Sequence, residues 1–166
     1  WSFIEGVTLD GLFIFGLSLY AQTHLGGTGV LVAGILMAVR YLSEMLFSPF
    51  GGRLADRFGA LRMLVILSLA TSLALLMFGS YWLFVGAFFV LVLRALQLPL
   101  VVTLVAQRNP QARIQALAGN AVWRDIGAGL GPILAGVLLP QVPAIWAYAG
   151  AALILALSAL GCAWRR

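Results

Sequence analysis

Seven charged side chains interrupt long apolar runs of this chain, and they are the residues whose types could do chemistry. A charge near the centre of a membrane-spanning helix costs about 2.5–3.5 kcal/mol, so a passive anchor has no use for one. The usual reasons to keep such charges are a water-lined pathway or partner charges inside a helix bundle. The seven are Glu5, Asp10, Arg40, Glu44, Arg94, Arg124 and Asp125.

Arg94 stands near the middle of its apolar run, where its side chain has the longest way to reach water. Gln97 follows three residues later on the same helix face, and Pro99 leaves the Ala95 carbonyl without its helical donor. A cation, an amide and a loosened backbone so close together favour a site of substrate binding or proton coupling. An ion pair that only stabilises packing is nearly as good an interpretation.

Asp10 is the second candidate for substrate binding or proton coupling, because a carboxylate within a membrane can carry a proton. The alternative is a carboxylate that is simply neutralised by Arg40, Arg94 or Arg124, and the sequence does not choose among these. Glu5 is expected near the membrane face, in contact with solvent.

Two charge pairs are predicted from spacing. Arg40 and Glu44 are four residues apart, so they share a helix face and can bind each other. A structural role is favoured there over a substrate contact. Arg124 and Asp125 are adjacent and form the second predicted pair.

The elements that must position these residues are predicted to be membrane-spanning helices, which makes the fold all-α and polytopic. Of the 166 residues, 63% are hydrophobic and 9% are charged, with a mean hydropathy of +1.06, whereas soluble domains are about 25% charged. Because a span needs about 20 apolar residues, the length fits about six spans. We expect one six-helix unit over residues 1–166, with helices near 2–23, 28–49, 61–79, 82–105, 114–139 and 143–164.

Arginines lie in alternate connections of this predicted bundle, and all ten basic residues are arginines. Cytoplasmic loops carry an excess of basic residues, so the arginine-bearing side is predicted to be cytoplasmic. Both ends of the segment then lie inside, which requires an even number of spans. No groove-reading pattern surrounds the arginines, so nucleic acid is not an expected partner. The arginines on this side are Arg53, Arg57, Arg62, Arg108, Arg113, Arg165 and Arg166.

Small residues recur at four-residue spacing in the fifth predicted helix. Gly127, Gly131 and Ala135 fall on one stripe, and such stripes allow two helix backbones to approach closely. Pro132 removes a backbone donor and creates a kink point. We therefore expect residues 127–136, including Gly136, to pack tightly against a neighbouring helix where the fifth helix can bend.

The connection between the second and third predicted helices reads GRLADRFG over residues 52–59, followed by Arg62. It resembles the signature cytoplasmic loop of the major facilitator superfamily, in position as well as in sequence. Gly52 and Gly59 would permit a tight turn, and Asp56 could cap a helix N-terminus. The resemblance implies that Gly52, Asp56, Arg57, Gly59 and Arg62 form a conformational latch between two halves of a transporter.

Two further motifs support this resemblance. The Arg94 to Gln97 segment is similar to the family's Arg-x-x-Gln-Gly motif, and residues 127–136 are similar to its Gly-x-x-x-Gly-Pro-x-x-Gly-Gly motif. Ala60 and Leu61 replace the usual basic pair after Gly59, Leu98 replaces the glycine of the first motif, and Ala135 replaces a glycine of the second. The departures weaken the inferences about the latch and about proton-coupled antiport more than the inference about the fold.

The resemblance covers essentially the whole chain as one six-helix half, and the family normally joins two such halves around a midplane site. We expect the C-terminal half, because Arg165 and Arg166 directly follow the last span. The motifs of the fourth and fifth helices, which are commonest in the first half, argue the opposite way. The implied partners are a small solute, the lipid bilayer and the missing half, in the same polypeptide or as a second copy.

The function implied is secondary active transport by alternating access in a bacterial inner membrane, with proton-coupled efflux of a small organic solute as the specific hypothesis. Helices one, two, four and five would line the pathway, and helices three and six would face lipid. A membrane enzyme is not expected, because no metalloprotease, serine hydrolase or paired-aspartate motif is present. No cofactor or metal is expected, since Cys162 and His24 are single. The remaining alternative is a non-transporting membrane scaffold or chaperone.

Overall fold

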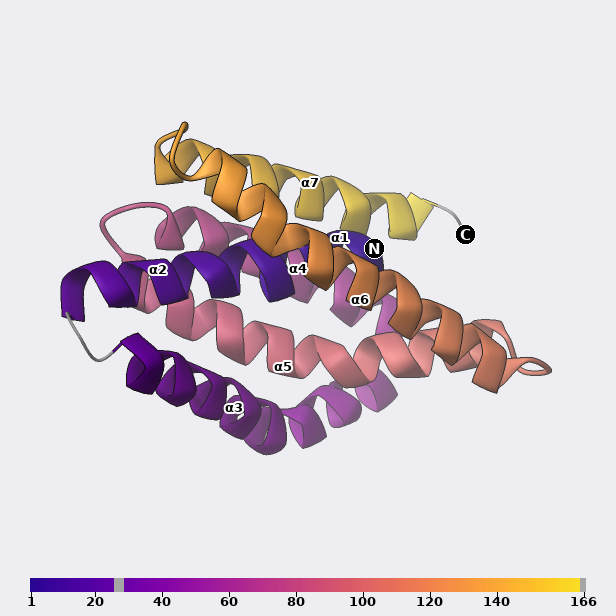
Figure 1. Cartoon of the computed structure of the whole chain (residues 1–166). Coiled ribbons are helices and arrows are strands. Elements are labelled where there is room, and N and C mark those ends of the chain that lie inside the picture. Colours follow the sequence, from indigo (N-terminus) through magenta and orange to yellow (C-terminus); the bar gives the residue numbers. More distant parts are fainter. Residues whose placement is uncertain (26–28, 165–166) are drawn as a thin grey trace.

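The computed structural model describes residues 1–25 and 29–164, and this part of the chain is all-helical, as predicted (Figure 1). The first rod is continuous through three segments, α1 (Ser2–Glu5), the π-helix η1 (Gly6–Phe13) and α2 (Ile14–Leu25). Five more helices follow, so six rods form the bundle. They are α3 (Gly29–Phe58), α4 (Ala60–Phe78), α5 (Leu83–Arg108), α6 (Arg113–Leu138) and α7 (Ala144–Trp164).

Five of the six rods are long and apolar enough to cross a membrane by length and composition. They are the first rod and α4 to α7, with 19 to 26 residues each. The remaining rod, α3, has 30 residues and carries Arg40 and Glu44. Its length also exceeds the about 20 residues that a span needs. The observed helices begin and end within a few residues of the expected ranges, except at the end of α3.

The prediction of a loop between the second and third helices is wrong for most of its length. α3 continues through Phe58, and Gly59 alone separates it from α4. The helix continues because Ala55 packs into an apolar cluster with Ala60, Leu64 and Leu100. Gly59 has φ +89°, a conformation that side chains disfavour. The tight turn therefore depends on this one glycine.

The rods pack in a consistent order. α4 packs between α5 and α7, α3 packs along α5, and η1 packs along α6. α3 and α7 consequently form opposite edges of the bundle (Figure 1). An aromatic chain joins η1, α4 and α7, with Phe78 in edge-on contact with both Phe13 and Tyr148 at ring-centroid distances of 4.8 and 4.7 Å.

The small-residue stripe of α6 lies directly against the first rod. Gly127, Gly131 and Ala135 are the buried residues of α6. A methyl group added at Gly131 would collide with the backbone of Gly11, and one added at Gly127 would collide with the carbonyl of Phe3. Glycine is thus required where the two backbones meet.

Gly136 does not belong to this interface, contrary to the expectation for residues 127–136. It is exposed, and a methyl group added there would meet no atom within 4 Å. The physical reason is helical rotation, because Gly136 is one residue past Ala135 and so lies about 100° away from the stripe. Pro132 lies inside α6, next to Gly131.

Candidate functional site

An ion-pair cluster joins the first rod, α3 and α5. Arg94 on α5 forms an ion pair with Asp10 on η1, with Nη2 at 2.5 Å from Oδ1, and binds Glu44 on α3 through Nη1. Arg40 on α3 approaches the same Asp10 oxygen at 2.6 Å and lies 3.3 Å from Glu44. The fifth member is Glu5, whose Oε1 lies 3.4 Å from Nε of Arg94.

The cluster is deeply buried around Arg94, whose side chain is 3% exposed, and opens toward Glu44, whose side chain is 21% exposed. Of the alternatives left open for Asp10, the structure brings Arg40 and Arg94 into contact with it, and Arg124 pairs elsewhere. Buried charges are tolerated when they are paired and hydrogen-bonded. The two arginines meet this condition by sharing the same two carboxylates, Asp10 and Glu44.

The π-helical geometry of η1 explains how Glu5 joins the cluster. Residues five apart on an α-helix point about 140° away from each other, whereas the i to i+5 pattern of a π-helix brings them toward one face. Glu5 directly precedes η1 and Asp10 lies within it, and both side chains contact Arg94. Such π-helical segments are frequent at functional sites.

The expectation that Glu5 is in contact with solvent is therefore wrong. Its side chain is 5% exposed, because the first rod packs that turn against α6. The sequence carried one usable signal: Gly6 and Gly127 together allow the close approach that covers Glu5. The π-helical winding, which turns Glu5 toward Arg94, has no recognisable pattern in the sequence.

A cavity of about 310 Å³ lies beside the cluster and is lined by four of the six rods. These are the first, second, fourth and fifth rods, which the sequence suggested as pathway-lining helices; α4 and α7 do not contribute. Tyr41 also lines it, with the Arg40 guanidinium 5.7 Å from its ring centroid. The lining residues are Asp10, Arg40, Tyr41, Glu44, Arg94, Leu98, Arg124, Asp125 and Ala128.

Arg124 and Asp125 face this cavity from α6 but stay apart from the buried cluster. The Arg124 Nη2 atom lies 3.3 Å from Oδ1 of Asp125, and the Asp125 side chain is 68% exposed. An exposed pair of this kind contributes little to stability. The pair instead places one charge of each sign at the edge of the cavity.

Gln97 lies away from the cluster, although it follows Arg94 on α5. Its amide nitrogen donates to the Thr71 hydroxyl on α4 at 2.6 Å, and its side chain is buried. The Gln97 Oε1 atom has no hydrogen-bond partner. The residue thus joins α5 to α4 and does not line the cavity of the cluster.

The residues of the predicted latch sit at the end of α3 and the start of α4. Asp56, Arg57 and Arg62 are exposed, and the Arg57 guanidinium lies 5.3 Å from the Phe58 ring centroid. No side chain caps the start of α4, so Asp56 does not cap that helix. Gly52 is inside a helix and makes no turn. Arg165 and Arg166 lie outside the described residues.

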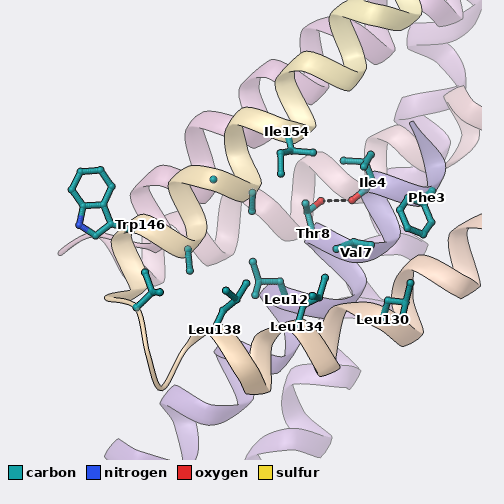
Figure 2. Close-up of a pocket in the computed structure, with 14 residues that line it drawn as sticks. Phe3, Ile4, Val7, Thr8, Leu12, Leu130, Leu134, Leu138, Trp146 and Ile154 are labelled. Atoms are coloured by element: carbon teal, nitrogen blue, oxygen red, sulfur yellow. Dashed lines mark hydrogen bonds between the residues drawn. The ribbon is translucent and has the colours of Figure 1, made fainter.

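A second cavity, of about 360 Å³, is a groove between the first rod, α6 and α7 (Figure 2). Its walls are apolar, with Leu134 and Leu138 from α6 facing Ile154 from α7. The one hydroxyl, on Thr8, already donates to the Ile4 carbonyl at 2.7 Å (Figure 2). Without a charged or titratable lining residue, this groove offers no coupling group.

Comparison of the sequence with known proteins finds a matching family and a relative. The profile described as Major Facilitator Superfamily matches residues 4–166. The multidrug resistance protein MdtG of Serratia proteamaculans (strain 568) is 31% identical over 147 residues, with 84% of this chain and 35% of that protein covered. The chain therefore spans about a third of the length of this relative. No solved structure matched the chain.

Proposed function

Because this chain belongs to the major facilitator superfamily, whose members are transporters and not enzymes, we propose that it is one six-helix half of a secondary transporter. It moves a small organic solute by alternating access, with a second half completing the central site. The observation that carries the proposal is the buried cluster around Arg94, which faces a cavity lined by four rods.

The proposed coupling is proton-driven efflux of the solute. Asp10 is held by two guanidiniums at the cavity wall, where a cationic solute would compete with them for the carboxylate. The relative that is 31% identical is named a multidrug resistance protein, which supports the proposal that organic compounds are exported from the cell. Asp10, Arg40, Glu44 and Arg94 are the proposed coupling residues.

The remaining half is proposed to be in the same polypeptide or in a second copy of this chain. We retain the assignment of residues 1–166 to the C-terminal half, in the inner membrane of a bacterium and with the arginine-bearing connections in the cytoplasm. The full reading frame tests it, since a six-span segment upstream is expected. The exposed Asp56, Arg57 and Arg62 are free to contact the other half as a latch.

The experiment is dye transport by the full-length protein in proteoliposomes. We expect ethidium, a cationic organic dye, to be moved faster when a proton gradient is imposed, and the Asp10→Asn variant to lose at least ten-fold of that stimulation. The Ser158→Ala variant on α7 serves as the control. Flux that does not change when the gradient is collapsed would exclude proton coupling. If the wild-type protein, in which Asp56 is unchanged, moves no cationic, neutral or anionic dye, the result would favour a non-transporting scaffold.

A further inference from the structure

Glu5 is the most weakly paired carboxylate of the buried cluster. Its contact with Arg94 is 3.4 Å long, and the Nε atom of Arg94 that faces it has no hydrogen-bond partner. Asp10, in contrast, forms ion pairs with Arg40 and Arg94 at 2.6 and 2.5 Å. Glu44 is also bound by both arginines. The guanidiniums thus stabilise the charges of Asp10 and Glu44 more than that of Glu5.

The cluster holds one carboxylate more than it holds guanidiniums. Glu5, Asp10 and Glu44 face Arg40 and Arg94, while Arg124 is engaged by Asp125. An unbalanced charge in a membrane interior is expensive, and binding one proton removes it. Charge balance therefore places one proton in the cluster, and the weak pairing places it on Glu5.

The elements packed against α1 carry several titratable groups within the described residues. η1 contributes Asp10, and α6 contributes Arg124 with Asp125. α7 contributes Tyr148, whose hydroxyl donates to the Leu12 carbonyl, and Cys162, which lines a cavity near Ser2. Within the cluster, Glu5 contacts Arg94 on α5 directly. Glu44 and Arg40 on α3 are linked to it only through Arg94 and its other ion pairs.

A short route leads from Glu5 toward one end of the bundle, through a small cavity and a larger, mostly apolar one. Glu5 borders a cavity of about 30 Å³ together with Ser2, Asn120 and Arg124, which is room for one or two water molecules. The Ser2 hydroxyl and Oδ1 of Asn120 are hydrogen-bonded at 2.5 Å across α1 and α6. Both residues also line a cavity of about 190 Å³ that reaches Asn109 at the end of α5.

On its other side, the small cavity adjoins the cavity of the ion-pair cluster. Leu98 and Arg124 line both spaces. Glu5 consequently borders the small cavity that lies between the cavity of the ion-pair cluster and the route toward the connection between α5 and α6. A residue that passes protons between the cavity of the ion-pair cluster and this route would need such a position.

We propose that Glu5 is the proton-carrying residue of the transporter, and that the Ser2 and Asn120 route exchanges its proton with the aqueous face at the connection between α5 and α6. When the proton leaves, the O–H bond of the Glu5 carboxyl breaks and a water molecule in the small cavity accepts the proton. The carboxylate that remains faces Nε of Arg94. This inference rests on the proposed function, but its first test does not require transport.

The first test is infrared difference spectroscopy of the purified full-length protein between low and high pH. We expect a carbonyl band of a protonated, buried carboxyl that is absent from Glu5→Gln. Glutamine copies the shape of the protonated side chain, so this variant should fold. Thr8→Val, one turn away on the same rod, should keep the band. A band that persists in Glu5→Gln, or its absence from the wild type, would overturn the proposal.

The second test separates proton carriage from solute handling. In proteoliposomes, Glu5→Gln should keep ethidium exchange between equal concentrations and lose at least ten-fold of accumulation driven by a proton gradient. A Glu5→Gln protein that accumulates dye as the wild type does would refute the inference, whichever solutes are carried. If the wild type has the infrared band but moves no solute, the proposed function fails while the proton site stands.

The third test addresses the route. The Asn120→Leu variant removes the amide from both cavities, so the infrared band should remain while its response to a pH jump slows by about ten-fold or more. An unchanged rate would exclude the Ser2 and Asn120 route.

Discussion

Arg94 is the residue on which the candidate site depends, because it is the one side chain that contacts all three carboxylates of the cluster, from the first rod and from α3. Its side chain is almost fully buried, so the carboxylates around it have little water to replace a lost guanidinium. In such surroundings, the loss of one partner leaves the others as uncompensated charges.

We therefore expect Arg94→Met to reduce the free energy of unfolding by about 3–5 kcal/mol, the range for breaking a buried ion pair. Arg113→Met is the matched control, since Arg113 is exposed at the start of α6 and its loss should change stability by no more than about 0.5 kcal/mol. Unfolding of the purified full-length variants in detergent measures both. Equal stability of the two variants would show that Arg94 does not hold the cluster together.

At the scale of elements, the contact between the first rod and α6 positions the site. Gly11 and Gly131 allow the two backbones to meet, and this contact lies one residue after Asp10 on η1. Association of membrane helices depends on such close packing, because lipid provides no hydrophobic force between helices. The small-residue stripe thus sets where Glu5 and Asp10 lie relative to α5.

Gly131→Leu should separate these rods, with a loss of stability of about 1–3 kcal/mol or more, as for overpacked cores, and with loss of dye transport. Gly136→Leu, five residues later on the same helix, should leave both nearly unchanged because the added side chain meets open space. Thermal unfolding and dye flux of the full-length variants provide the comparison. Similar effects at both positions would argue against a specific contact.

At the scale of the whole molecule, the exposed surface of the six-helix bundle is strongly apolar along α6 and α7. Large hydrophobic side chains are exposed along α6 and α7, among them Ile133, Val137 and Leu157. Patches of this size on a protein mark an interaction surface or a membrane. The bilayer and the second half together would cover this surface in the proposed transporter.

The arginine distribution makes a prediction about orientation. In a full-length background without other cysteines, Asn109→Cys between α5 and α6 should react with a membrane-impermeant maleimide only after intact cells are permeabilised. Tyr81→Cys, in the exposed turn between α4 and α5, should react from outside. The reverse pattern would invert the orientation and, with it, the direction of the route that begins at Glu5.

The helical class and the number of rods were readable from the sequence because each rod is a local run of apolar residues, and a membrane leaves few alternatives to helices. The spacing of Arg40 and Glu44, four residues apart, likewise predicted a contact that requires only helical winding. Gly127 and Gly131 could be assigned to a packing stripe for the same reason. Local periodicity was sufficient for all of these.

The sequence by itself determined that charges would lie inside a bundle of apolar helices, and that pairing or a pathway must account for them. Only the tertiary structure decided that Asp10 binds Arg40 and Arg94 instead of Arg124, that Glu5 is buried, and that α3 continues to Phe58. These outcomes depend on which rods are neighbours, on a π-helical turn and on contacts between segments far apart in the chain. Electrostatic pairing acts through space, so it is settled where the backbones meet and not by the order of the residues.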